Sequence, residues 1–487
     1  MKTLVRPNRF LGTLLALLAS VSAFGEPCPK GMHWDETTKA CVCDAGTHWD
    51  EGMKMCMPDD APPTCPPGTH WSVEEDQCVP DVPTDPHNCG PNGHWDDGMQ
   101  MCMPNGDTTL SFHINQYLVG ITESGPRGRT AFSAPNMFML TFQQKIAKCD
   151  SVKVQWMGTT DKWTVPALGT PELLQTGEAN KAGVPYVDAQ HPHSTPVMGL
   201  TFAEVHCFGK EGQNAFTISF SPRGEATAGP EAFMHRPSAE GNPNAPLSHH
   251  LQDVFHIMST VLAAKLDIGK WSIEGSIFSG KEPSPAEVNL DMHKFDSYGV
   301  RVDRKLNDHF TVGASAASVL EQHRVPTGQT PENPTRTTMI ASWLYTNHQF
   351  KGGSINTSSI YGRGSEEGYP LNSFLEELRV NFGEQERDHV FSRLEVLQRT
   401  PDQLEVNIVG DGKHPEWVKA FTLGYERNLG TRGGATFYGG TSVTRSFVPT
   451  DFKATYGVNP LSAEIHLRIT FVKNRSWSKG TKLKPLP

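Results

Sequence analysis

Residues 464–471 have the sequence Glu-Ile-His-Leu-Arg-Ile-Thr-Phe, in which polar and apolar side chains alternate without a break. The same period of two occurs at residues 215–220 and 377–382. This alternation predicts β-strands that have one apolar and one polar face. Most runs long enough for a helix contain Gly, Pro or this same spacing. The sequence therefore predicts an all-β fold for the larger part of the chain.

Sixteen strands are predicted, and the lengths of their connections separate a barrel from a soluble sandwich. Long and short connections alternate along the chain, so that the long ones gather at one end of the strands. Bacterial outer-membrane barrels have an even strand number, short periplasmic turns and longer external loops. We therefore expect a transmembrane antiparallel β-barrel of about 16 strands over residues 108–471, followed by a basic C-terminal tail at 472–487. The expected strands are 110–121, 136–147, 151–158, 198–207, 214–221, 254–267, 270–279, 295–304, 309–320, 336–346, 352–361, 371–382, 388–398, 416–427, 435–445 and 462–471.

The first residues have the pattern of an export signal. Lys2, Arg6 and Arg9 precede an apolar run that ends in small residues at 21–23, which predicts a cleaved signal peptide at residues 1–23. No other stretch approaches the roughly 18 consecutive apolar residues of a membrane-spanning helix, and a barrel is the other structure that satisfies every backbone group in a bilayer. We therefore expect a Gram-negative outer-membrane protein with lipid around the barrel and with both chain ends in the periplasm.

Residues 26–107 contain four copies of one short repeat. Two cysteines separated by twelve residues bound each copy, and His-Trp follows the first cysteine by five positions. One disulfide per copy, worth about 3 kcal/mol, is expected where so short a unit has little core. Acidic residues number 16 against 3 basic ones here, and no basic surface suits a nucleic acid. We interpret this segment as an acidic periplasmic stalk with the pairs Cys28–Cys41, Cys43–Cys56, Cys65–Cys78 and Cys89–Cys102.

Two of the long connections between strands are rich in histidine. Imidazole and carboxylate groups are ligands for copper or zinc, and the spacing of residues 250, 253 and 256 gathers them if that stretch turns helically. Methionines beside the second and fourth repeats also suit copper, although packing over the disulfides is an alternative interpretation. Histidines that hold the loops inward as a plug, or a hydrolytic site at Ser248, are alternatives for the loops. The candidate metal ligands are His191, His193, His235, His249, His250, Asp253 and His256.

Cys149 and Cys207 fall at the ends of short turns on one side of the expected barrel, where a fifth disulfide is geometrically reasonable. Charged residues in the expected strands have both signs, which predicts a wet or plugged interior without strong ion selectivity. These strand residues are Glu274, Arg301, Glu377, Arg379, Arg393, Glu395, Glu464 and Arg468.

Three segments resemble a largely uncharacterised family of bacterial outer-membrane β-barrel proteins. They are the Gln-His-Pro-His motif at 190–193, the run 229–239, and the stretch 242–253, which ends in His-His-Leu-Gln-Asp. The resemblance covers roughly residues 111–471, implies a barrel and supplies no established activity. Ser194 stands where the family pattern has an acidic residue.

The sequence thus predicts a non-enzymatic barrel that binds or passes metal ions, with copper preferred and zinc as the other cofactor considered. The alternative function is envelope anchoring, in which the His-Trp repeats bind cell wall, a saccharide or a protein partner.

Overall fold

The computed structural model describes residues 106–477, apart from 180–183, 194–195, 284–287, 322–334, 367–368 and 409–411, together with short strands between residues 32 and 104. The chain divides into two compact units, Met1–Pro83 and Thr84–Pro487, and each is described by itself. The expected signal peptide and the stalk cysteines Cys28, Cys65 and Cys89 lie outside the described residues. In the described part of the chain, no helix has the length and apolar character needed to cross a membrane.

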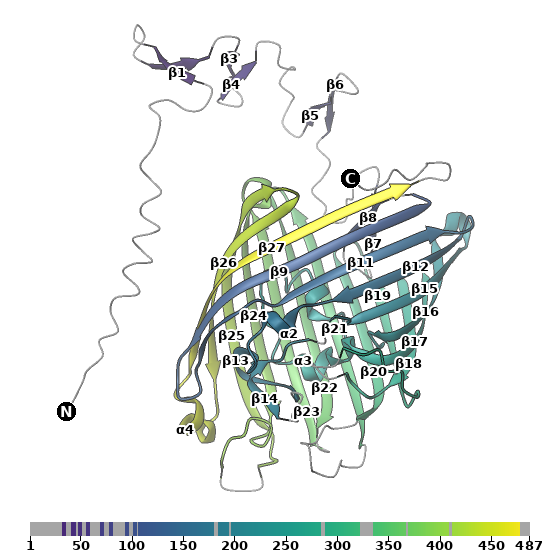
Figure 1. Ribbon diagram of the computed structural model, residues 1–487, viewed down its shortest axis with the longest axis vertical. Helices are drawn as coiled ribbons and strands as arrows, with labels where there is room; N and C mark the ends of the chain where they lie inside the picture. Colours follow the sequence, from purple (N-terminus) through teal and green to yellow (C-terminus); the bar gives the residue numbers. More distant parts are fainter. Residues whose placement is uncertain are drawn as a thin grey trace, which may run out of the picture. The chain divides into compact units, whose positions relative to one another are not determined.

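The larger unit contains a closed antiparallel barrel with sixteen strand positions among its described residues (Figure 1). β10 and β11 together occupy one position, because both pair with β9. β27 pairs with β9 from Ser462 opposite Glu123 to Trp477 opposite Thr108, and this seam closes the barrel. The strands are β9 (Thr108–Glu123), β10 (Thr130–Ser133), β11 (Asn136–Lys145), β12 (Asp150–Gly158), β15 (Gly199–Phe208), β16 (Asn214–Gly224), β17 (Met258–Ile268), β18 (Trp271–Ser279), β19 (Ser297–Lys305), β20 (Phe310–Glu321), β21 (Thr335–Phe350), β22 (Gly353–Glu366), β23 (Tyr369–Phe382), β24 (Asp388–Arg399), β25 (Glu416–Arg432), β26 (Ala435–Phe447) and β27 (Leu461–Trp477).

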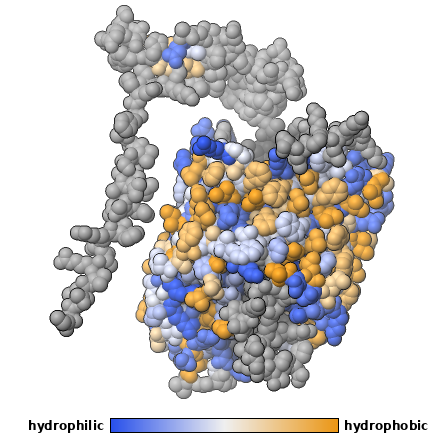
Figure 2. Space-filling model, in the orientation of Figure 1, coloured by the Kyte–Doolittle hydropathy of each residue, from blue (hydrophilic) through white to orange (hydrophobic). Residues whose placement is uncertain are grey.

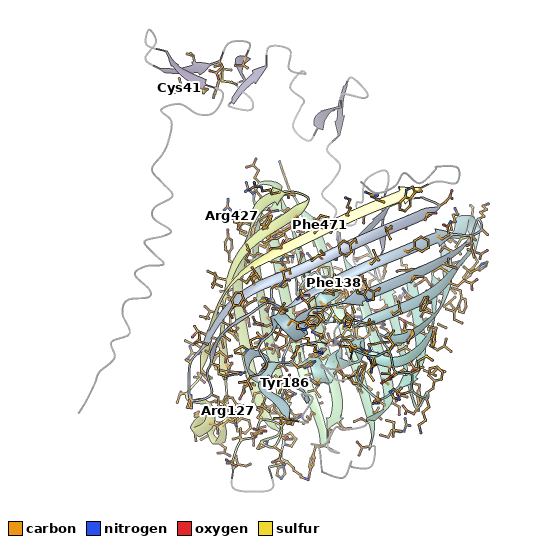
Figure 3. All side chains as sticks on the ribbon, viewed as in Figure 1. Cys41, Arg127, Phe138, Tyr186, Arg427 and Phe471 are labelled. Carbon is orange, nitrogen blue, oxygen red and sulfur yellow. A yellow bond between two sulfur atoms is a disulfide. The ribbon has the colours of Figure 1, made fainter. Side chains whose placement is uncertain are left out.

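The barrel is apolar outside and polar inside. Large apolar side chains point outward from the strands and remain exposed, as at Phe216, Leu423 and Ile465. Figure 2 shows hydrophobic side chains over much of the strand surface. Phe138 and Phe471, which Figure 3 labels, lie on strands of this surface. The inner faces carry buried charged residues, which include Glu377, Arg379, Arg393, Glu395, Glu464 and Arg468. An apolar exterior around a polar interior is the pattern of a barrel surrounded by lipid hydrocarbon. The closed barrel and this pattern confirm the predicted fold class, a transmembrane antiparallel β-barrel of about 16 strands.

Connection lengths sort to opposite ends of the barrel, with one exception. The seven turns at one end are short, and the other end carries the long segments 159–198 and 225–257. The exception is the connection between β22 and β23, which has two residues because both strands extend further than expected. The last strand likewise continues past Phe471 to Trp477.

The two longest connections fold into the barrel and form what we call the plug, residues 159–198 and 225–257. The first contains α2 (Asp161–Thr164) and a hairpin of β13 (Thr170–Ala179) and β14 (Pro185–Gln190). The second contains η2 (Phe233–His235), α3 (His249–Gln252) and η3 (Val254–His256). Figure 1 shows α2, α3, β13 and β14 among the strands. The expectation that a strand starts at residue 254 is wrong, because residues 249–252 and 254–256 turn helically and the strand begins at Met258. The inward fold of the two loops matches the plug that the sequence offered as an alternative.

Other short helical segments lie in the connections. They are η1 (Lys210–Gly212), η4 (Glu384–Glu386), η5 (Thr450–Phe452) and α4 (Lys453–Tyr456). Near the first of them, Cys149 forms a disulfide with Cys207, as the sequence predicts, where β15 leaves the barrel wall.

The smaller unit contains three short antiparallel hairpins among its described residues. They are β1–β2 (Met32–Asp35 and Ala40–Cys43), β3–β4 (Thr47–Asp50 and Met55–Pro58) and β5–β6 (Thr69–Ser72 and Gln77–Pro80). A fourth hairpin, β7–β8 (Gly93–Asp96 and Met101–Pro104), belongs to the larger unit. Cys43 is bonded to Cys56, the partner that the repeat spacing predicts, and Cys41 is also disulfide-bonded. The other stalk pairings lie outside the residues whose side chains are described.

Candidate functional site

Five imidazoles of the plug form a closed ring, which we call the histidine ring. His191 and His193 come from the first plug segment, and His249, His250 and His256 come from the second. The centroids of neighbouring imidazoles in this cluster are 5.7 Å (191–193), 5.6 Å (193–256), 4.8 Å (256–249), 5.4 Å (249–250) and 6.4 Å (250–191) apart. Imidazoles that share one metal ion through nitrogen atoms about 2.0 Å from it have ring centres roughly 5 Å apart. The ring therefore gathers metal-ligand side chains at a suitable spacing.

Three of these imidazoles are oriented through Nδ1 by an acceptor group. His249 Nδ1 lies 2.5 Å from Asp253 Oδ1, His193 Nδ1 lies 3.3 Å from Asp161 Oδ2, and His256 Nδ1 lies 3.1 Å from the carbonyl oxygen of Asp253. An acceptor at Nδ1 keeps the proton there and leaves the lone pair at Nε2, which is how metal-binding histidines are usually oriented. His256 Nε2 is buried and has no hydrogen-bond partner among the described residues.

Burial keeps several of the ring imidazoles neutral. It lowers the pKa of His191, and the neighbouring imidazoles lower it further, to well below the ordinary value of 6.5. Burial and the adjacent His249 have the same effect on the pKa of His250 and of His256. Neutral imidazole is the form that binds metal ions. These side chains need not lose a proton when a cation arrives.

Asp161, on α2, is a site residue that the sequence analysis missed. Its carboxylate is buried, accepts a hydrogen bond from the backbone N–H of Asn136, and also contacts His193. Gly177 has a similar supporting role, since a Cβ there would lie 2.7 Å from His191 Nδ1. Neither residue stands in a histidine-rich segment, so no local sequence signal marks them.

The ring is a cluster of ligand types rather than a finished coordination site. In the described part of the chain, no three His, Cys, Asp or Glu side chains already have the arrangement of a metal site. His249, His256 and His193 are adjacent in the ring, and rotations of their side chains would be needed to bring three Nε2 atoms to one point. The donor set is nitrogen-rich, which suits zinc or copper(II) better than a hard cation such as magnesium.

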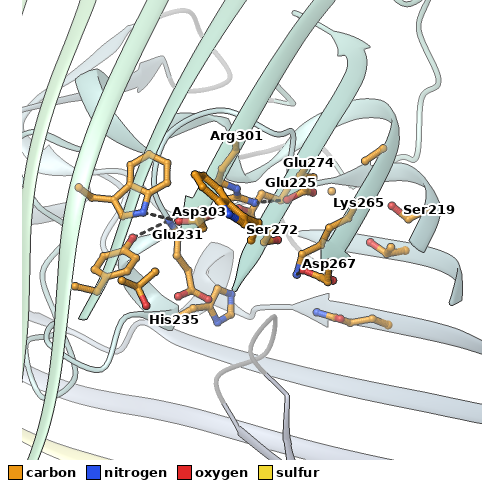
Figure 4. Close-up of a pocket in the computed structure, with 18 of the residues that line it drawn as sticks. Ser219, Glu225, Glu231, His235, Lys265, Asp267, Ser272, Glu274, Arg301 and Asp303 are labelled. Atoms are coloured by element: carbon orange, nitrogen blue, oxygen red, sulfur yellow. Dashed lines mark hydrogen bonds and ion pairs between the residues drawn. The ribbon is translucent and has the colours of Figure 1, made fainter. Parts of the chain in front are cut away.

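The structure separates the seven residues predicted as ligands into two groups. Asp253 lies beside the ring as a hydrogen-bond acceptor, and the helical turn expected at 250–256 is present. His235 instead lines a separate cavity (Figure 4). Ser248, considered as a nucleophile, is fully buried, and its hydroxyl lies 3.2 Å from both Glu395 Oε1 and Gln252 Oε1.

Polar contacts hold the plug to the barrel wall on many sides. Arg236 reaches Glu377 on β23 at 2.9 Å, and Glu240 meets Arg468 on β27 at 2.6 Å. The other contacts to the wall include Thr227 N to Ser276 Oγ, Gly229 N to Ser315 Oγ, Gln252 Nε2 to Ser373 Oγ, Ser248 N to Glu395 Oε1 and Asn244 Nδ2 to Glu464 Oε2. Strands from β18 round to β27 thus anchor the plug.

Fold and site together define a transmembrane β-barrel whose lumen contains a histidine-rich plug. No family model matches the sequence, and no curated protein matches it. Among solved structures it is similar to a loop-deletion mutant of OmpT, an outer membrane protein of Vibrio cholerae (8% identity, 75% of this chain, 100% of that chain, TM-score 0.46). It is also similar to OmpF of Salmonella typhi in complex with daunomycin (9% identity, 75% of this chain, 97% of that chain, TM-score 0.46). A third similar structure is an anion-selective porin from Comamonas acidovorans (9% identity, 75% of this chain, 99% of that chain, TM-score 0.46). Similarity at this level says nothing about cargo or activity.

Proposed function

We propose that this chain is an outer-membrane barrel that binds a transition-metal ion, copper(II) or zinc, at the histidine ring of its plug. The observation that carries the proposal is His256 Nε2, a buried ring nitrogen without a partner among the described residues, between two neighbouring imidazoles. A buried polar atom without a partner costs roughly 1–3 kcal/mol, and a bound metal ion removes that cost. Copper is the first choice because its affinity for such nitrogen donors exceeds that of zinc.

The placement in the envelope is part of the same proposal. The apolar exterior suits outer-membrane lipid, and the short turns suit the periplasmic side. β9 begins and β27 ends at the short-turn end, which supports a periplasmic position for the N-terminal repeats and the C-terminal tail. The anchored plug supports binding in the lumen rather than free diffusion through it. Passage of the ion across the barrel would require the plug to move.

Equilibrium metal binding tests the proposal. Mature protein in detergent is stripped with a chelator and titrated with Zn²⁺ or Cu²⁺, and bound metal is quantified by elemental analysis. We expect one ion per chain with wild-type protein, and at least tenfold weaker binding when His193, His249 or His256 is replaced by Ala. His414→Ala is the matched control, because His414 is exposed in another connection. Equal binding by wild-type protein and all three ring variants would overturn the proposal.

Thermal unfolding separates loss of ligands from loss of structure. Each variant is heated with and without metal, and circular dichroism follows the barrel. A bound ion stabilises the state that binds it, so the wild-type midpoint rises with metal concentration. We expect the His256→Ala barrel to fold and to show no such rise.

The N-terminal repeats favour a second function, which uses a different part of the chain. Trp49 on β3 is 42% exposed beside the Cys43–Cys56 disulfide, and an exposed indole is a common contact residue for partners. We propose that such tryptophans bind cell-wall material or an envelope protein. Co-sedimentation of the full chain with purified peptidoglycan tests this function, and equal pelleting of the wild type and Trp49→Ala would count against it.

A further inference from the structure

A cavity of about 500 Å³ lies inside the barrel between the plug and the short-turn end. Plug residues Glu231 and His235 line one part of it, and Gly269 and Lys270, in the turn from β17 to β18, line another. Figure 4 draws His235 together with the charged residues of the lining. The cavity contains none of the five residues of the histidine ring. Any ligand that it holds therefore belongs to a different site.

A row of three ligand-type side chains crosses the wall beside this cavity. Met139 on β11 stands directly opposite His113 on β9 and directly opposite Met157 on β12. Residues paired in this way share one face of the sheet, with Cβ atoms about 5 Å apart. That face is the lumen side, since Met139 and Met157 are buried and Met157 lines the cavity. One imidazole and two thioethers thus lie in line on adjacent strands.

The plug supplies a second imidazole and another thioether over this row. Met234 packs against the buried cluster of Met137, Met157, Met198 and Ile257. His235 follows Met234 directly and lines the same cavity as Met157. Burial, and then His113, lower the pKa of His235 to about 4, so its ring is neutral at physiological pH. No described residue donates a hydrogen bond to this ring or accepts one from it.

We propose that His113, Met139 and Met157, together with Met234 and His235 of the plug, bind a cuprous ion. The site is distinct from the histidine ring and does not depend on the ring's function. Barrel interiors are normally polar, so a patch of methionines on the lumen wall is unusual. Thioether sulfur is a soft ligand that selects Cu(I), and imidazole accepts the same ion.

The surroundings of the row suit such a soft cation. Gln155, which also lines the cavity, donates a hydrogen bond to Met139 Sδ at 3.0 Å and orients the thioether. The cavity reaches the short-turn end, which gives the ion a route that avoids the plug. Its carboxylates and basic groups are nearly balanced in number, so a monovalent ion meets little net repulsion.

Titration with Cu(I) tests the site on the full mature chain in detergent. Cu(I) is supplied under anaerobic conditions from a chromophoric chelator that competes for it. The M139L/M157L double variant conserves side-chain volume and removes both sulfurs of the row, so the barrel is expected to fold. We expect it to bind one Cu(I) fewer per chain than the wild type, or to bind that ion at least tenfold more weakly. X-ray absorption of the loaded protein should show fewer sulfur neighbours per copper in the variant.

Controls identify the source of any loss. Met339→Leu removes an equally buried thioether from another cluster and should bind as the wild type does. Methionines of the stalk are present in every variant, so they contribute equally and cancel in the difference. The proposal is overturned if the double variant keeps the full Cu(I) stoichiometry and affinity, or if Met339→Leu loses the same ion. Zn²⁺ titration of the double variant reports the histidine ring separately.

Discussion

Replacement of Arg236 by Met should release the plug from the barrel wall. The guanidinium is 1% exposed and lies 2.6 Å from Asp253 Oδ2 and 2.9 Å from Glu377 Oε2, so it joins the second plug segment to β23. Loss of one partner from a buried ion pair costs about 3–5 kcal/mol. Asp253 keeps His249, and Glu377 keeps Arg393 at 3.1 Å, so the lower end of that range applies here. About 3 kcal/mol shifts the ratio of seated to released plug more than 100-fold.

Conductance across a planar bilayer measures this shift directly. A sixteen-stranded barrel without its plug leaves an aqueous channel, so Arg236→Met should conduct in long openings where the wild type is mostly closed. Arg427→Met is the control, because that arginine is 52% exposed and solvent screens its ion pair with Asp388. The reasoning would be refuted if Arg236→Met folded, conducted no more than the control, and unfolded at the wild-type temperature.

Three further predictions concern the stability and seating of the plug and wall. A double Cys149→Ser/Cys207→Ser variant removes a link across 58 residues, for which chain entropy gives about 4 kcal/mol, so its thermal midpoint by circular dichroism should fall; an unchanged midpoint would contradict this. Partial desolvation raises the pKa of Glu240, whose side chain is 47% exposed, but Arg379 and Arg468 outweigh this effect and lower that pKa to about 2. This residue's contribution to seating should therefore persist above pH 4.5 and be lost as the pH falls from 4.5 towards 2. Conductance between pH 7 and pH 3 checks the direction, and Glu240→Gln should remove this part of the pH response. Gly229→Ala places a Cβ 1.8 Å from the carbonyl oxygen of Gln252, at a φ of +82°, so the variant should show a mobile plug by hydrogen exchange; wild-type protection would disprove the clash.

The sequence predicts the barrel well because strand pairing repeats one simple rule. Alternation places side chains such as Leu467 and Arg468 on opposite faces, and all sixteen predicted segments correspond to strand positions. The ends of strands follow the rule less closely. Between Phe471 and Trp477 the side chains are mostly polar, yet the backbone continues to pair with β9, because ladder hydrogen bonds do not depend on side-chain type.

The candidate site is less predictable, because it depends on how two distant segments fold together. The histidine-rich composition identifies His191 and His256 as candidate ligands. Only the folded plug brings both side chains beside the same residue, His193. The hairpin β13–β14 is not expected either, since its strands are interrupted by bulges and bury their residues in the lumen. The prediction for His235 fails in the opposite way. This residue lies in the same plug segment as His249 and His256, yet its side chain lines a separate cavity and is not part of the histidine ring.

The seam between β9 and β27 constrains the order in which this molecule assembles. The strand that completes the cylinder also carries Arg468 and Glu464, whose partners Glu240 and Asn244 belong to the loop inside. After β27 pairs with β9 and closes the barrel, the second plug segment, which has more than thirty residues, can enter the lumen only through an open end of the barrel. A nascent chain that seats its inner loop before the final strand docks would meet those partners in place, whereas early closure would leave two charged groups facing an unfilled pore.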